Sequence, residues 1–175
     1  MCARLIELFD SVPQYQQPNG GAMRPGLEQS QWTELNVSQL SDAGFLGFFR
    51  RHIDAGLARY NADIGLAPIA VPNSPLTADL ILKRYRPNGV ERFQVHFDAV
   101  NEMADRYLVF LWYLNDVARG GATEFPQLHM SIAPRAGRLL IFPPYWMFQH
   151  GGLPPESGDK YILSTYLLFP GRQAK

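Results

Sequence analysis

From about residue 76 onward, short apolar segments alternate with turn residues, and this pattern constrains the fold more than any other feature of the sequence. Segments rich in Val, Ile, Leu, Phe and Tyr are typical of strands, whereas Pro87-Asn88-Gly89 and Pro134-Arg135-Ala136-Gly137 favour turns. The segment 106–114 is apolar on both faces, as in a central strand that is covered on both sides. The predicted strands are 78–86, 93–97, 106–114, 122–124, 128–133, 139–142, 149–152 and 161–169. Many short strands predict a mostly β protein, a two-sheet jelly-roll or cupin-like barrel.

The first 75 residues are expected to support this barrel with helices and loops. Residues 1–10 fit a short helix or an edge strand, residues 12–26 an irregular loop, and residues 31–37 a short strand. Apolar side chains then recur every three or four positions up to Tyr60, which predicts an amphipathic helix from an N-cap at Ser38 or Ser41 to about Asn61. A single domain, 1–175, is therefore expected, with 1–75 as N-terminal support and 76–170 as the core.

Composition excludes several classes of function. The chain has 46% hydrophobic residues, 18% charged residues and no net charge, so it lacks the basic excess typical of proteins that bind nucleic acid or anionic membranes. Cys2, the one cysteine, excludes an internal disulfide and fits a reducing compartment. Neither a signal peptide nor a transmembrane segment is indicated, and a cytoplasmic location is expected.

One histidine and one aspartate stand two residues apart, at His96 and Asp98. In a strand, these two side chains point to the same side. A third ligand must come from elsewhere in the chain, and His150 is favoured over its rival, His129. Two imidazoles and one carboxylate that leave coordination positions open are typical of non-haem Fe(II) oxygenases. The His-x-Asp spacing alone equally fits the polar face of a surface strand.

Lys160 begins the last predicted strand, ten residues after His150. The two-residue period of a strand places Ile162, Ser164 and Tyr166 on the same face as Lys160. A lysine that points inward from an apolar strand needs an anionic partner. A dicarboxylate bound to the metal at one end would supply that partner at its other end. The alternative is a solvated lysine beside Asp159.

Several blocks of sequence follow one another in a characteristic order. They are His96-Phe97-Asp98, Tyr113–Val117 with Gly120–Pro126, Pro134–Phe142, His150-Gly151-Gly152 and Gly158–Tyr161. Over about residues 79–170, this order resembles that of the prolyl-4-hydroxylase-like Fe(II)/2-oxoglutarate oxygenases. Several ordered blocks are more specific than any single motif.

The resemblance implies a double-stranded β-helix with iron at one mouth of the barrel and N-terminal helices as a buttress. His96, Asp98 and His150 match the catalytic iron ligands of the family, and Lys160 matches the residue that binds the distal carboxylate of 2-oxoglutarate. Further co-substrate contacts are matched by Tyr85, Thr123 and Tyr166, each of which also has a packing or turn interpretation. The family often has a tryptophan where this chain has Tyr166.

The approach to His96 departs from the family pattern, because Val90-Glu91-Arg92 lengthens the hairpin that flanks the substrate entrance in the family. Arg92 and Phe93 are therefore candidate substrate contacts, with solvated loop residues as the alternative.

The implied activity is a 2-oxoglutarate-dependent hydroxylation with Fe(II) and O2, and with ascorbate as a further reductant to test. A peptidyl residue such as proline is the first expected substrate, and a free amino acid or small metabolite is the alternative. A catalytically silent jelly-roll binding module is a hypothesis from another class. A nucleic-acid demethylase is disfavoured by the neutral charge and by Lys160 in place of an arginine pair. The sequence leaves the oligomeric state open.

Overall fold

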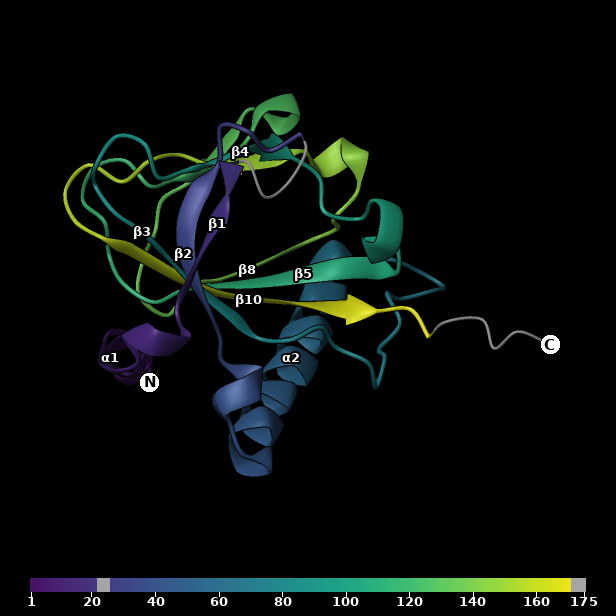
Figure 1. Ribbon diagram of the computed structural model, residues 1–175. Coiled ribbons are helices and arrows are strands. Elements are labelled where there is room, and N and C mark those ends of the chain that lie inside the picture. Colours follow the sequence, from purple (N-terminus) through teal and green to yellow (C-terminus); the bar gives the residue numbers. More distant parts are fainter. Residues whose placement is uncertain (22–25, 171–175) are drawn as a thin grey trace.

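The structure is a computed structural model of the chain, and it describes residues 1–21 and 26–170. The described residues form two α-helices, α1 (Cys2–Ser11) and α2 (Ala43–Ile64), and most of the strands follow α2 in the chain (Figure 1). The strands are β1 (Gln17–Gly20), β2 (Gln31–Asn36), β3 (Ile81–Tyr85), β4 (Phe93–His96), β5 (Arg106–Tyr113), β6 (Thr123–Phe125), β7 (Met130–Ile132), β8 (Leu139–Phe142), β9 (His150–Gly152) and β10 (Lys160–Leu168). Within the described residues, 3-10 helices lie at Pro13–Tyr15, Ser38–Leu40, Asn101–Met103, Pro126–Leu128 and Trp146–Phe148.

The strands form two antiparallel sheets. The major sheet has the order β1-β2-β3-β10-β5-β8, and the minor sheet has the order β4-β9-β6-β7. Each strand predicted after residue 76 is present within a few residues of its expected bounds. β5 lies between β10 and β8 and is buried from its second residue to its last, as expected for an apolar central strand. The prediction of a mostly β, two-sheet architecture is confirmed.

Helix α2 covers the outer face of the major sheet, on the side of β5 and β8 that faces away from the minor sheet (Figure 1). Its buried residues Phe49, Ile53 and Leu57 repeat at four-residue spacing and pack into the core with the outer face of β5. Gly56 lets the helix approach closely, because a Cβ there would lie 3.1–3.3 Å from side chains of β8 and β5.

The predicted N-cap of α2 was wrong. The cap is Asp42, whose carboxylate accepts the main-chain N–H of Phe45 at 2.8 Å. Ser38 instead begins a 3-10 helix, and the Ser41 hydroxyl donates to the Val37 carbonyl at 2.7 Å. Both serines are therefore engaged in the turn that precedes the helix.

The N-terminal part holds more strand than expected. Residues 1–10 lie in a helix and residues 31–36 form the predicted short strand, but β1 forms within the predicted irregular loop 12–26. β1 pairs with β2 from Gln17 opposite Glu34 to Gly20 opposite Gln31. Because β1 is an edge strand, its Pro18 is tolerated despite lacking an N–H donor. Residues 22–25 of that loop lie outside the described residues.

Two apolar clusters stabilise the fold on either side of the major sheet. One joins α1 and α2 to its outer face and so contains residues from both the N-terminal part and the strands. The other lies between the sheets and includes Trp32, Tyr85, Tyr113 and Phe125. None of the described helices is long and apolar enough to cross a membrane. The second cluster surrounds the site described next.

Candidate metal centre

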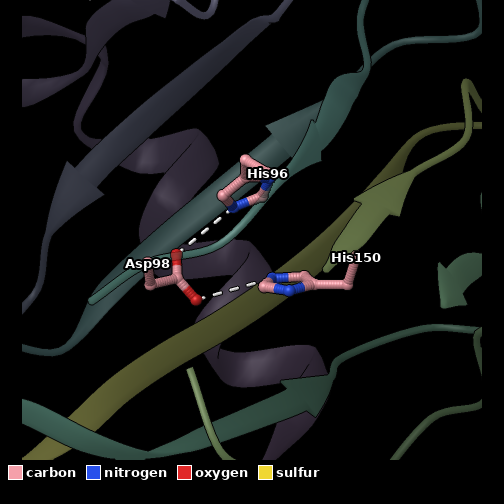
Figure 2. A group of neighbouring side chains, drawn as sticks. All are labelled: His96, Asp98 and His150. Carbon is pink, nitrogen blue, oxygen red and sulfur yellow. Dashed lines mark hydrogen bonds and ion pairs between the residues drawn. The ribbon is translucent and has the colours of Figure 1, made fainter. Parts of the chain in front are cut away.

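The predicted triad comes together where β4 and β9 pair. His96 ends β4, His150 begins β9, and the two residues are direct partners across this antiparallel pair. Facing side chains in such a pair interact directly, and the two ring centroids lie 4.4 Å apart. Asp98 follows β4, where its main-chain N–H donates to the Pro144 carbonyl at 3.0 Å. The ligand atoms of the three residues all lie within 4.8 Å of one another (Figure 2).

Main-chain carbonyls fix the orientation of both imidazoles. His96 Nδ1 lies 2.8 Å from the Gln94 carbonyl oxygen, and His150 Nδ1 lies 3.1 Å from that of Phe148. A carbonyl can only accept, so each Nδ1 carries the proton that it donates. In neutral rings this leaves both Nε2 atoms with lone pairs, and these atoms face the Asp98 carboxylate in Figure 2. Such outer hydrogen bonds set the tautomer of metal-binding histidines.

The Asp98 carboxylate is buried between these rings. Its Oδ1 lies 3.2 Å from His96 Nε2 and accepts the Tyr166 hydroxyl at 3.1 Å. Its Oδ2 lies 3.5 Å from His150 Nε2 and has no hydrogen-bond partner among the described residues. A buried carboxylate oxygen without a partner is costly, and a cation would satisfy it. The donor set therefore fits a divalent metal ion.

The charge states of the triad also fit a metal. Burial would raise the pKa of Asp98, but the hydrogen bond that His96 donates in its protonated form and the positive charges of the protonated imidazoles outweigh burial and hold that pKa well below its usual range. Burial lowers the pKa of His150 to about 4, although the Asp98 carboxylate opposes this effect. At neutral pH, the centre thus offers an ionised carboxylate and a neutral His150 ring.

Aromatic side chains hold the ligand rings in place. Phe93 stacks on His96 with ring centroids 3.8 Å apart and planes 12° apart. Phe142 meets His150 edge-on at 4.6 Å, and Phe125 lies 5.7 Å from the same ring. Phe93, predicted as a substrate contact, also lines the cavity of the triad. It can therefore both support the His96 ring and contact a substrate.

The rival ligand His129 lies elsewhere. It is exposed and follows the 3-10 helix Pro126–Leu128, where its φ is 51°.

Lys160 lines the same cavity as the triad but belongs to the major sheet. The space around the cavity's lining side chains, including the part that is open to solvent, is about 430 Å³. Lys160 is only 2% exposed, and among the described residues none forms a hydrogen bond or ion pair with its ammonium group. Burial lowers its pKa to about 7, and the charge of Lys83 acts in the same direction. The solvated alternative for Lys160 is therefore wrong, and the buried cation lacks the anion that it needs.

Two further predicted contacts, Tyr85 and Thr123, line this cavity beside Lys160. Tyr85 is the direct cross-strand partner of Lys160, and burial raises the pKa of its hydroxyl well above the usual value. The Thr123 hydroxyl accepts a hydrogen bond from the Tyr113 hydroxyl at 2.7 Å, which leaves its own proton to donate. Tyr113 was not singled out as a site residue, although strand alternation places it on the inner face with Leu111.

Tyr166 lies on the same face of β10 as Lys160, as predicted, but its hydroxyl contacts the predicted metal ligand Asp98. Its hydroxyl donates to Asp98 Oδ1, and the Arg106 guanidinium stacks 4.0 Å from the centroid of its ring. Tyr166 also lines the cavity, so its predicted contact with 2-oxoglutarate stays a prediction.

Arg92 points away from the triad's cavity. Its guanidinium donates to the main-chain carbonyl and the side-chain oxygen of Gln29, at 3.2 and 2.8 Å. It lines a separate, more open hollow together with Gly20, Gly89 and Val90. A substrate contact for Arg92 stays a prediction, and it would have to be made from that hollow.

The sequence resembles known oxygenases. The family model described as the 2OG-Fe(II) oxygenase superfamily matches residues 80–168. An Acanthamoeba polyphaga mimivirus protein assigned as a prolyl 4-hydroxylase is 29% identical over 107 residues, which are 50% of this chain and 43% of the viral protein. Human prolyl 4-hydroxylase subunit alpha-1 is 29% identical over 87 residues, 43% of this chain and 16% of the subunit. The match thus spans less than half the length of either relative.

Solved structures agree with the fold. A Pseudomonas putida prolyl-4-hydroxylase has a TM-score of 0.68 at 16% identity, with 97% of this chain and 84% of that chain covered. A Trichoplax adhaerens prolyl hydroxylase, solved with a peptide fragment of the hypoxia inducible factor oxygen degradation domain, has a TM-score of 0.69 at 15% identity, with 95% and 75% covered. Together with the two observed sheets, these likenesses confirm the predicted double-stranded β-helix.

Proposed function

This chain belongs to the 2OG-Fe(II) oxygenase superfamily, and on that basis we propose that it is an Fe(II)- and 2-oxoglutarate-dependent dioxygenase that hydroxylates a C–H bond. In the overall reaction, O2, 2-oxoglutarate and the C–H group give succinate, CO2 and a C–OH group. The observation that carries the proposal is a single cavity that holds the His-Asp-His cluster and the unpaired Lys160 together.

The residues of β4 and β9 would hold the metal. Fe(II) would supply the oxidising chemistry when bound, because no side chain of the cavity can activate O2 itself. The Nε2 atoms of His96 and His150 and the carboxylate of Asp98 are the donors. One carboxylate neutralises only half the charge of a divalent ion, so the site still favours an anionic co-substrate. The remaining coordination positions suit chelation by 2-oxoglutarate.

Lys160 would bind the other end of the co-substrate. A carboxylate beside its ammonium group would form a charge-assisted hydrogen bond in a buried environment, which is among the stronger polar contacts in proteins. The hydroxyls of Tyr85 and Thr123 line the cavity near Lys160 and can donate to the same carboxylate. The aromatic rings around this end exclude water. These residues therefore position the co-substrate and leave the oxidation to the metal.

A peptidyl residue such as proline is the substrate proposed first, because the relatives are prolyl hydroxylases and one neighbour was solved with a peptide. A free amino acid or small metabolite remains the second candidate. The silent binding module is disfavoured on physical grounds: without metal and dicarboxylate, the unpartnered Asp98 Oδ2 and the unpaired Lys160 would only destabilise the fold. A reducing, cytoplasmic location is also proposed, since the chain has a single cysteine.

The test is succinate formation from 2-oxoglutarate in air with Fe(II), with and without ascorbate, in the presence of prolyl peptides and free amino acids. We expect succinate that depends on Fe(II) and is lost in His96→Ala. His129→Ala is the matched control, because it removes an exposed imidazole outside the cluster and should leave turnover unchanged. Manganese and cobalt in place of iron would identify which divalent ion supports turnover.

Binding measurements separate the alternatives. Calorimetry should detect binding of 2-oxoglutarate to the metal-loaded wild type. This binding should be lost in Lys160→Met. Absence of both succinate and 2-oxoglutarate binding would reject the oxygenase proposal in favour of the silent module.

A further inference from the structure

Lys160 is the first residue of β10, at a point where the major sheet is incomplete. On one side it pairs directly with Tyr85 of β3. On the other side β5 ends at Tyr113, which lies opposite Ile162. Among the described residues, no strand therefore pairs with Lys160 on the β5 side. A lysine that has to stay inside the cavity is thus placed at a strand end, where a sheet frays most easily.

The side chain of Asn115 takes the place of the missing strand. The pairing of β5 with β10 continues one step beyond β5, because the Leu114 N–H donates to the Tyr161 carbonyl at 2.9 Å. In a regular antiparallel pair, the Tyr161 N–H would donate back to the Leu114 carbonyl. It donates instead to the side-chain oxygen of Asn115 at 2.8 Å, and the Asn115 amide group donates to the Asp159 carbonyl at 2.7 Å. Asn115 thus binds the main chain on both sides of Lys160.

Asn115 acts from outside the cavity. Its amide group also donates to the Asp116 carbonyl at 3.2 Å, which fixes the side chain within its own turn. The residue is half-buried, so water competes less for these hydrogen bonds than it would at an exposed site. Asn115 does not line the cavity of the metal centre, so any effect on a ligand has to pass through Lys160.

Two glycines border the Lys160 side chain inside the cavity. A Cβ at Gly121 would lie 3.4 Å from Lys160 Cδ, and a Cβ at Gly152 would lie 3.5 Å from Lys160 Nζ, both at van der Waals contact. The stem and the ammonium group therefore lie against the main chain of other segments, with little free space beside them. The position of the ammonium group then depends on where the main chain of Lys160 enters β10.

We propose that Asn115 is a positioning residue for the co-substrate: it holds the start of β10 in place, so that Lys160 meets the distal carboxylate of 2-oxoglutarate. The inference rests on the proposed function, because it requires that Lys160 binds this carboxylate. Without the Asn115 side chain, the start of β10 would be open for part of the time. The apparent dissociation constant is the intrinsic one divided by the fraction of competent protein, so 2-oxoglutarate would bind more weakly.

The experiment compares two 2-oxo acids that differ by one carboxylate. 2-Oxobutyrate has the same metal-chelating end as 2-oxoglutarate and lacks the distal carboxylate that Lys160 would bind. Calorimetry on the Fe(II)-loaded proteins under nitrogen gives both dissociation constants, and their ratio measures the contribution of the Lys160 end. A general loss of stability would weaken both acids alike and would leave this ratio unchanged.

Asn115→Ala is the test variant, and Asn61→Ala is its matched control. Asn61 is a half-buried asparagine of α2 that accepts the Val71 N–H and donates to the Val71 carbonyl, both at 3.0 Å. It therefore makes the same pair of main-chain hydrogen bonds, and it does not line the cavity. Circular dichroism checks that each variant is folded. If Asn115→Ala does not fold, Asn115→Ser replaces it, because a hydroxyl can restore one of the two hydrogen bonds.

In wild type and Asn61→Ala, we expect 2-oxoglutarate to bind at least about tenfold more tightly than 2-oxobutyrate, since hydrogen bonds to charged groups are worth this much. In Asn115→Ala, this ratio should fall by about fivefold or more, while the dissociation constant of 2-oxobutyrate changes by less than about twofold. Hydrogen–deuterium exchange of the ligand-free proteins gives a second readout. The segment 159–161 should exchange faster in Asn115→Ala than in the wild type.

The inference is overturned if the Asn115 variant keeps the wild-type ratio, if it weakens both acids equally, or if its segment 159–161 exchanges no faster. A ratio that falls as far in Asn61→Ala also overturns it, because a general loss of stability would then explain the effect. If the wild type binds 2-oxoglutarate no more tightly than 2-oxobutyrate, or binds neither acid, the role of Lys160 in the proposed function is rejected, and the inference with it.

Discussion

Replacement of Lys160 by methionine should stabilise the protein without ligands and abolish co-substrate binding at the same time. The lysine is 2% exposed, lies on the central β10 and forms no ion pair with the described residues. Methionine has a similar length, fills the same space between the aromatic rings and carries no charge. The substitution therefore removes the charge with little change in packing.

The size of the effect follows from the pKa of Lys160, which burial lowers from 10.5 to about 7. Each factor of ten in proton affinity is worth about 1.4 kcal/mol, so the buried lysine destabilises the fold at neutral pH by on the order of 4 kcal/mol. Between pH 7 and 10.5 the unfolded chain binds this proton and the folded chain does not. The free energy of unfolding should therefore rise with pH through this window, and the penalty is fully present below it.

The assay is thermal unfolding of wild type and Lys160→Met between pH 6.5 and 10, with and without metal and 2-oxoglutarate. At about 2–4 °C per kcal/mol, the variant should unfold roughly 10 °C higher near pH 7, and the gap should narrow toward pH 10. Addition of 2-oxoglutarate to the metal-loaded proteins should raise the midpoint of the wild type alone. A variant that is less stable than wild type at neutral pH, or a gap that does not change with pH, would refute the reasoning.

Three other substitutions test contacts around the site and the fold. Tyr166→Phe removes the donor to Asp98 Oδ1 and should weaken metal binding about tenfold by calorimetry, as loss of outer-shell partners does; unchanged affinity would contradict this role. Glu91→Ala removes a carboxylate that is 1% exposed and accepts a hydrogen bond from the Arg86 guanidinium at 2.6 Å. Urea denaturation should therefore show that the free energy of unfolding falls by about 2–3 kcal/mol. A fall of less than about 0.5 kcal/mol would mean that the loop tolerates the loss of this carboxylate. Asp42→Ala removes the N-cap of α2 and should lower the free energy of unfolding by about 1 kcal/mol, whereas Ser41→Ala at the wrongly predicted cap should have a smaller effect.

The triad could be predicted because two of its ligands lie close together in the sequence, and because the residue type restricts the choice of the third. His96 and Asp98 lie two apart at the end of a strand, and few histidines compete for the third position. The sequence does not reveal that His150 lies directly opposite His96. That contact joins residues 54 positions apart through strand pairing that skips several intervening strands, and only the assembled sheet sets its register.

Other features were missed because local composition conflicts with the tertiary context. Gln17–Gly20 contains proline, asparagine and glycine, which favour a turn. The segment nevertheless forms a strand, because it pairs with the edge of β2. Lys83 lines the cavity and shares its face with Tyr85 by simple alternation, so this placement was predictable. The contact of its ammonium group with the Phe93 ring was not, because Phe93 comes from the other sheet.

The two ends of the cavity belong to different sheets, and this has a consequence for binding. All three metal ligands lie on or next to β4 and β9 of the minor sheet, whereas Lys160 and Tyr85 lie on β10 and β3 of the major sheet. A dicarboxylate that touches both ends would bridge the sheets, so metal and 2-oxoglutarate should each raise the affinity for the other by the same factor. In Lys160→Met, the metal site is left intact on the minor sheet. Without 2-oxoglutarate, we therefore expect this variant to bind metal with the same affinity as the wild type. With 2-oxoglutarate, the metal affinity should increase in the wild type but not in the variant. A metal affinity that fell with the lysine, in the absence of 2-oxoglutarate, would mean that the two sheets do not act as independent halves of the site.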